Sequence, residues 1–160
     1  MSPRSFCPTC KTQLSLSQLI PFFGYLANKG KCSKCNKQID GSYLFNEIFT
    51  AALLIYLINL LGLLSPMTWL IFSIVVILYV QALMDLKTLL LSQPLSFLLI
   101  FIGLVANLGF QIFAVPLDAL LGIIFGYGLL FSINMLYKML RSHDGIGSGD
   151  FLLLSGIGSI

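Results

Sequence analysis

The stretch IFTAALLIYLINLLGLLSPMTWLIFSIVVILYVQALM, residues 48–84, contains no charged side chain. A helix needs about 20 consecutive apolar residues to cross the hydrocarbon core of a bilayer. Turn-forming residues between Gly62 and Pro66 interrupt the stretch near its middle. The stretch therefore predicts two membrane-spanning helices joined by a tight turn.

Three further apolar stretches follow. The first covers residues 94–114 and opens with a proline, which suits the first turn of a helix. Pro116 then breaks the chain, and residues 117–137 form a fourth span. A fifth stretch, residues 151–160, has only ten residues, too few to cross a bilayer. We expect an all-α polytopic membrane protein with about four complete transmembrane helices and a partial fifth, in a chain that is incomplete at its C-terminus.

The composition agrees with this fold class. Hydrophobic residues make up 58% of the chain and charged residues 9%, whereas about a quarter of the residues in ordinary globular domains are charged. The net charge is +3, and most basic residues precede the first apolar span: Arg4, Lys11, Lys29, Lys31, Lys34 and Lys37. We expect two domains, a basic polar module over residues 1–46 and a transmembrane domain over residues 47–160. The N-terminus lacks the apolar segment of a signal peptide.

The polar module contains all four cysteines, as the pairs Cys7–Cys10 and Cys32–Cys35. Each C-x-x-C pair can present two thiolates to one metal ion, so the two pairs together predict a structural zinc site with four cysteine ligands. So small a polar module needs a metal ion or disulfides to fold. Two disulfides, or a redox-active pair, are the alternatives. Zinc is favoured because the distribution of basic residues along the chain places the module in the reducing cytosol.

The basic residues also predict the orientation of the chain. Two spans separate the polar module from Lys87, and two more separate Lys87 from Lys138 and Arg141. All of these residues therefore lie on one side of the membrane, and the turns near Ser65 and Val115 on the other side carry no basic residue. The positive-inside rule makes the basic side cytoplasmic. A zinc ribbon that binds nucleic acid is not expected, because no aromatic residues are interleaved with the lysines of the module.

Two carboxylates, Asp85 and Asp150, are expected at this cytoplasmic surface. Asp85 ends the second span, and Asp150 lies within the glycine-rich stretch GIGSGDF, residues 145–151. Gly147 and Gly149 have no Cβ and would let a substrate backbone approach Asp150. Two carboxylates in one partly desolvated site cannot both ionise easily, so one keeps a proton while the other acts as a base on water. The pair therefore suggests an aspartic protease.

The alternative interpretation of each aspartate is a helix cap or a residue at the membrane interface. That interpretation is favoured for Asp118, which is expected near the outer face, and for Asp144, which is expected in a cytoplasmic loop. Gln81 lies one turn before Asp85 and could orient it, although such a residue more often links two helices. The same linking role is expected for three asparagines, Asn59, Asn107 and Asn134. Gly122 and Gly126 have the spacing of a close contact between helices.

The ordered combination of these features resembles the type IV prepilin peptidase family. It comprises the cysteine pairs, SYLFNE at residues 42–47, ALMD at residues 82–85 and Gly-x-Gly-Asp at residues 147–150, and it covers nearly the whole chain. The resemblance implies an aspartic endopeptidase of the bacterial plasma membrane that cleaves the leader peptide of prepilins or pseudopilins at the cytoplasmic face. It assigns catalysis to Asp85 and Asp150. In many members the same protein then methylates the new N-terminus with S-adenosylmethionine.

The sequence departs from the family pattern at several positions. Members usually have a hydrophobic helix before the cysteine module, which is not found ahead of Cys7. A second acid and a Pro-Asp pair usually follow the first catalytic aspartate, where this chain has Lys87 and Ser92-Gln93. A lysine usually follows the second, where this chain has Leu152. A truncated, inactive relative and a zinc-binding membrane scaffold are therefore the alternative functions.

Overall fold

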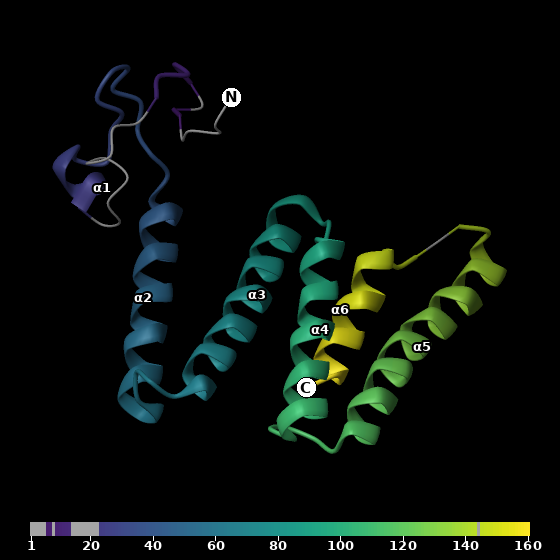
Figure 1. Ribbon diagram of the computed structural model, residues 1–160. Helices are drawn as coiled ribbons and strands as arrows, with labels where there is room; N and C mark the ends of the chain where they lie inside the picture. Colours follow the sequence, from purple (N-terminus) through teal and green to yellow (C-terminus); the bar gives the residue numbers. More distant parts are fainter. Residues whose placement is uncertain (1–5, 8, 14–22, 144) are drawn as a thin grey trace. The chain divides into compact units, whose positions relative to one another are not determined.

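The computed structural model describes residues 6–7, 9–13, 23–143 and 145–160, so the prediction for Asp144 lies outside the described residues. The chain divides into two compact units, Met1–Thr68 and Trp69–Ile160. The described residues form six helices (Figure 1): α1 Phe23–Ala27, α2 Gly41–Leu61, α3 Pro66–Thr88, α4 Gln93–Phe110, α5 Pro116–Arg141 and α6 Ser148–Gly158.

Four of these helices, α2 to α5, are long and apolar enough to cross a membrane. The 11-residue helix α6 is too short to do so. The described part of the chain contains no extended strand, only two isolated bridges. The prediction of an all-α protein with four helices able to span a membrane, followed by a shorter apolar helix, is confirmed.

Glycine and prolines mark the helix ends that the sequence indicates, but other ends differ from the predicted spans. Helices α3 and α5 continue to Thr88 and Arg141, and α4 ends at Phe110, because Gln111 turns the chain with a φ of 49°. Gly62 ends α2 with a φ of 87°, a conformation that glycine adopts without strain. Prolines open α3 and α5, and α4 has one in its first turn. A further difference is at the start of α2, which begins at Gly41, ahead of the uncharged stretch. It does so because the Asp40 carboxylate caps it by accepting a hydrogen bond from the Ser42 N–H at 3.0 Å.

Glycines bring α5 and α6 into close contact within the unit Trp69–Ile160 (Figure 1). A Cβ atom added to Gly122 would collide with the carbonyl group of Gly158, and one added to Gly158 would collide with that of Gly122. A Cβ on Gly126 would come within 2.7 Å of the Leu154 carbonyl oxygen. The predicted close contact at Gly122 and Gly126 is therefore confirmed, and its partner is α6.

Helix α4 covers another side of α6 and also meets α3. Asn107 of α4 is fully buried and donates from Nδ2 to the Ser159 carbonyl oxygen at 2.8 Å. A small core between α3 and α4 is formed by Ile74, Ile77 and Leu99. Asn107 is thus a helix-linking residue, as expected. Asn59 is not, because its amide donates to the Ile55 carbonyl oxygen of its own helix.

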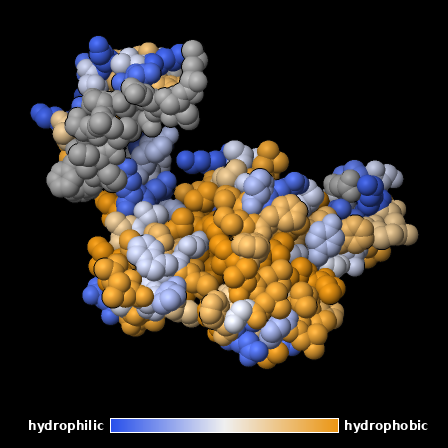
Figure 2. Space-filling model, in the orientation of Figure 1, coloured by the Kyte–Doolittle hydropathy of each residue, from blue (hydrophilic) through white to orange (hydrophobic). Residues whose placement is uncertain are grey.

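Hydrophobic side chains also cover the outside of the helices (Figure 2). Large exposed ones occur on every long helix, among them Tyr56, Leu86, Phe101, Phe125 and Leu136. An apolar exterior of this extent is unfavourable in water and favourable against lipid chains. The exterior agrees with a multi-pass membrane protein.

The contact between α5 and α6 leads to a test of the packing. Gly122→Ala should lower the free energy of unfolding by about 1–3 kcal/mol, because the new methyl group forces the two backbones apart. Thermal unfolding in detergent or nanodiscs measures the change.

Gly128→Ala is the matched control, because Gly128 lies in the same helix and a Cβ there would meet nothing within 4 Å. It should change the stability by less than about 1 kcal/mol. Equal effects of the two substitutions would contradict the packing described here.

Candidate metal centre and active site

The two cysteine pairs fold into loops of the same design. In the first loop the Cys7 N–H donates to the Thr12 carbonyl oxygen at 3.0 Å, and the Lys11 N–H donates back to the Cys7 carbonyl oxygen at 2.8 Å. Lys11 has a φ of 53°, so the chain turns sharply directly after Cys10. The turn places both sulfur atoms on the same side of the loop.

The second loop repeats these bonds at equivalent positions. The Cys32 N–H donates to the Lys37 carbonyl oxygen, and the Asn36 N–H donates to the Cys32 carbonyl oxygen, both at 2.9 Å. Asn36, directly after Cys35, has a φ of 55°. The repetition explains how sequences that share little beyond their cysteines present their thiols in the same way.

The four sulfur atoms of Cys7, Cys10, Cys32 and Cys35 gather at one point. They all lie within 4.8 Å of one another, with 3.9 Å between Cys7 and Cys35 and 3.9 Å between Cys10 and Cys32. Four thiolates about 2.3 Å from a central ion, in a tetrahedron, would lie about 3.8 Å apart. All four are free thiols, so the arrangement could hold a metal ion and does not form the alternative pair of disulfides.

Local hydrogen bonds favour the thiolate form of two of these cysteines. The side chain and backbone of Thr12 lower the pKa of Cys10 from 9.0 to about 6. The backbone N–H groups of Cys35 and Lys34 lower the pKa of Cys32. At Cys35 the Lys37 backbone N–H lowers the pKa, but burial and the neighbouring thiols outweigh it and raise the pKa to about 11. Because a metal ion binds the thiolate, Cys10 and Cys32 are the two cysteines best prepared for a cation.

The two predicted catalytic aspartates lie at helix ends. Asp85 lies in the last turns of α3, where its side chain is exposed. Asp150 lies in the first turn of α6 and is half-buried, and its Oδ2 accepts a hydrogen bond from the Gly147 N–H at 3.1 Å. Asp150 therefore caps its own helix. No hydrogen bond among the described residues joins the two carboxylates.

Contacts around the start of α4 bring these two helix ends to the same end of the unit Trp69–Ile160 (Figure 1). The Gln81 side chain of α3 accepts a hydrogen bond from the Ser92 N–H at 3.0 Å. The next residue, Gln93, donates from Nε2 to the Ser148 Oγ of α6 at 2.9 Å. The end of α3 and the beginning of α6 therefore meet the same short segment of chain.

The glycines before Asp150 serve this packing. A Cβ on Gly149 would lie 2.8 Å from the Leu91 Cβ, and one on Gly147 would lie 3.2 Å from the Asp150 Oδ2. Both glycines thus allow close approach within the protein, to the loop before α4 in one case and to the capping carboxylate in the other. The predicted access for a substrate backbone stays a prediction.

The remaining polar residues have structural partners. Asn134 of α5 accepts hydrogen bonds at its Oδ1 from the N–H groups of Gly145 and Ile146, and so holds the loop that leads to α6. Asp118 lies in the first turn of α5, at the opposite end of that helix from this loop. Ser92, Ser96 and Ser148 also bond to side chains of this region, and none of them was predicted to do so from the sequence. The sequence gives only a weak indication of these three serines: polar residues lie on both sides of Pro94 and directly before Asp150.

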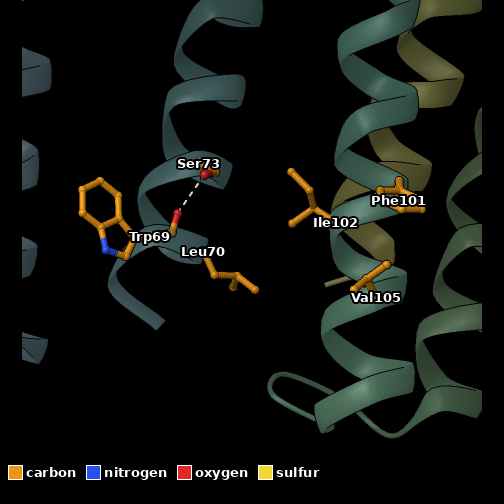
Figure 3. Close-up of a pocket in the computed structure, with 6 residues that line it drawn as sticks. All are labelled: Trp69, Leu70, Ser73, Phe101, Ile102 and Val105. Atoms are coloured by element: carbon orange, nitrogen blue, oxygen red, sulfur yellow. Dashed lines mark hydrogen bonds between the residues drawn. The ribbon is translucent and has the colours of Figure 1, made fainter. Parts of the chain in front are cut away.

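A hollow between α3 and α4 lies away from these helix ends. It has a volume of about 320 Å³ and is lined almost entirely by apolar side chains (Figure 3): Trp69, Leu70, Ser73, Phe101, Ile102 and Val105. The Ser73 hydroxyl donates to the Trp69 carbonyl oxygen of its own helix at 2.7 Å. Ser73 precedes Asp85 by about 18 Å along an α-helix. The hollow is therefore separate from the candidate active site.

Two family profiles together match nearly the whole chain. The profile of the bacterial peptidase A24 N-terminal domain matches residues 1–61, and that of the type IV leader peptidase family matches residues 70–160. The first match includes the four cysteines, and the second includes both aspartates. No solved structure matches the chain.

Curated relatives agree with the profiles. Proteins named prepilin leader peptidase/N-methyltransferase are 36% identical over 160 residues in Pseudomonas aeruginosa, 34% over 168 in Aeromonas salmonicida and 32% over 165 in Neisseria gonorrhoeae. These alignments cover 98%, 99% and 99% of this chain, and 53%, 54% and 55% of the respective relatives. The chain thus spans about half the length of the curated relatives it matches. On the profile match over residues 70–160, the chain belongs to the type IV leader peptidase family.

Proposed function

We propose that this chain carries the catalytic residues of a membrane-embedded aspartic endopeptidase that removes the leader peptide of type IV prepilins or pseudopilins. One observation supports the proposal most: Asp85 lies near the end of α3 and Asp150 in the first turn of α6, and residues of both helices, Gln81 and Ser148, bond to the same segment around Ser92. Family membership provides the reaction class, and the relatives' names provide the substrate class.

In this mechanism the two carboxylates share one proton. The ionised carboxylate takes a proton from a water molecule, whose oxygen attacks the scissile carbonyl carbon. The protonated carboxyl group then donates to the leaving amine, and no covalent intermediate with the protein forms.

The proposed site faces the cytoplasm from a bacterial plasma membrane. Lys87 lies in the last turn of α3, and Lys138 and Arg141 lie in the last turn of α5. If α2 to α5 each cross the membrane once, these basic helix ends and the cysteine module all lie on the same side. The positive-inside rule then places the module and both aspartates in the cytoplasm. The expected partners are the prepilin or pseudopilin substrate and the lipid bilayer.

We propose structural zinc as the occupant of the cysteine cluster. Four thiolate ligands in a tetrahedron are the typical donor set of structural zinc, and cytosolic thiols stay reduced. Zinc would hold the two loops of the module together in the place of a hydrophobic core. It would take no part in peptide cleavage, because four protein ligands leave no open position for water.

The relatives' names also include an N-methyltransferase. By this likeness we propose that the same protein methylates the amine released by cleavage, with S-adenosylmethionine as the methyl donor. The mass of the mature pilin N-terminus reports this second reaction separately from cleavage.

The carboxylate pair leads to a direct test of the proteolytic function. Asp85→Asn and Asp150→Asn keep the shape of the side chains and remove their ability to exchange a proton, so each should reduce prepilin cleavage by at least about 100-fold. Cleavage is followed in membranes that contain the protein and a prepilin, by the mobility of the processed pilin on gels.

Asp118→Asn is the matched control, because it removes the same charge at the first turn of α5, the opposite end of that helix from the loop before α6. It should leave the rate unchanged. Near wild-type processing by the Asp85→Asn variant would rule out the pair as the catalytic machinery.

The cysteine cluster leads to a second test. Purified protein should contain about one zinc ion per chain by elemental analysis. Cys10→Ser should release the ion, because three thiolates and a hydroxyl bind zinc far more weakly. Acidification should release it from the wild-type protein as well, since protons compete for the thiolates.

Lys34→Ala serves as the control, because Lys34 lies in the second loop with an exposed side chain and contributes only its backbone N–H to Cys32. It should retain the zinc. Protein without metal whose cysteines do not react with thiol reagents would contradict the zinc assignment and favour disulfides.

A further inference from the structure

Gln81 is a fully buried polar side chain in a membrane-spanning helix. Both polar atoms of its amide are hydrogen-bonded. Nε2 donates to the Ser96 Oγ of α4 at 2.7 Å, and Oε1 accepts from the N–H of Ser92, the residue before α4, at 3.0 Å. A buried amide that lost these partners would be left unsatisfied in an apolar medium, which is costly. The two bonds therefore fix how the end of α3 lies against the beginning of α4.

The hydrophobic contacts between α3 and α4 do not fix the rotation of α3 as these hydrogen bonds do. Ile74 and Ile77 pack on Leu99 below the amide, and hydrophobic contacts are not directional. They would tolerate a small rotation or sliding of α3. Two hydrogen bonds of defined geometry would not.

Gln81 and Asp85 lie four residues apart on α3, on the same face and about 6 Å apart along the helix axis. A rotation of α3 that breaks the amide bonds would therefore also move Asp85. The segment that receives these bonds also contacts α6, through Gln93 to Ser148 and through Leu91 against Gly149. Asp150 directly follows Gly149. A continuous set of contacts thus runs from Gln81 to the residue beside Asp150.

We propose that Gln81 is a positioning residue for the Asp85–Asp150 pair, holding α3 through Ser92 and Ser96 in the register that the two carboxylates need. The inference rests on the proposed peptidase function. In this role Gln81 touches neither the substrate nor the reacting atoms. It affects the reaction only through the position of Asp85.

Steady-state kinetics of the whole protein in nanodiscs, with a purified prepilin, tests the proposal. Gln81→Met keeps the length of the side chain and removes both hydrogen bonds. It should lower kcat by about 10- to 100-fold with little change in KM, because a carboxylate displaced by about 1 Å affects the transition state more than substrate binding. Ser96→Ala, which removes one of the two bonds, should give a smaller decrease in the same direction.

Two further variants separate positioning from general damage. Gln81→Glu keeps the length and, protonated at this buried site, can still donate to Ser96 and accept from Ser92, so it should restore most of kcat. Ser73→Ala is the matched control, because the Ser73 hydroxyl bonds only within α3. It should have wild-type kcat. A wild-type kcat for Gln81→Met, or equal losses for Gln81→Met and Gln81→Glu, would overturn the proposal.

Hydrogen exchange distinguishes failure of this inference from failure of the peptidase assignment. Gln81→Met should speed amide exchange around residues 89–93 and at the start of α6, whatever reaction the protein catalyses. Unchanged exchange would show that Gln81 does not hold this region and would overturn the proposal. Absence of cleavage by the wild-type protein would instead remove the peptidase assignment, and exchange would still decide whether Gln81 fixes the helix ends.

Discussion

Every backbone N–H and C=O group in a bilayer must find its partner within the protein, and this constraint determines the rest of the structure. It makes the four apolar stretches helical over their whole length. Chemistry that needs water is therefore confined to the helix ends, where the two aspartates lie. It also makes the loss of a hydrogen bond from a buried amide such as Gln81 more costly than in water, because solvent cannot replace the lost partner.

Close packing determines which helix ends come together. Three glycines let the backbones of α5 and α6 come into contact: Gly122, Gly126 and Gly158. Asn107 of α4 donates a hydrogen bond to the Ser159 carbonyl oxygen, directly after α6. Helix α6 is thereby held between α4 and α5, with Asp150 at its beginning. The cysteine module uses a different means: two loops of the same design gather four thiols at one point.

Most of the fold could be predicted from the sequence, because its main signals are local. Apolar stretches of sufficient length, Gly62, Pro66 and Pro116 give the helices and their ends, and the C-x-x-C spacing gives the cysteine cluster. The partners of polar side chains could not be predicted in the same way. Gln81 bonds Ser92 and Ser96 and not Asp85, and Gly149 packs on Leu91. Both contacts depend on how one helix is rotated against its neighbour. The spacing of residues within a single helix does not specify that rotation.

The proposed mechanism requires Asp85 and Asp150 to lie together at one end of the helices. Cross-linking tests it most directly, with Asp85→Cys and Asp150→Cys in one chain, a short bifunctional thiol reagent and a protease site inserted between α4 and α5. After protease treatment the two fragments should stay joined. They should separate in the single Asp150→Cys variant and in a Ser73→Cys, Asp150→Cys pair, because Ser73 lies about 18 Å from Asp85 along α3. Fragments that separate after treatment of the Asp85–Asp150 pair would show that the two aspartates do not lie together.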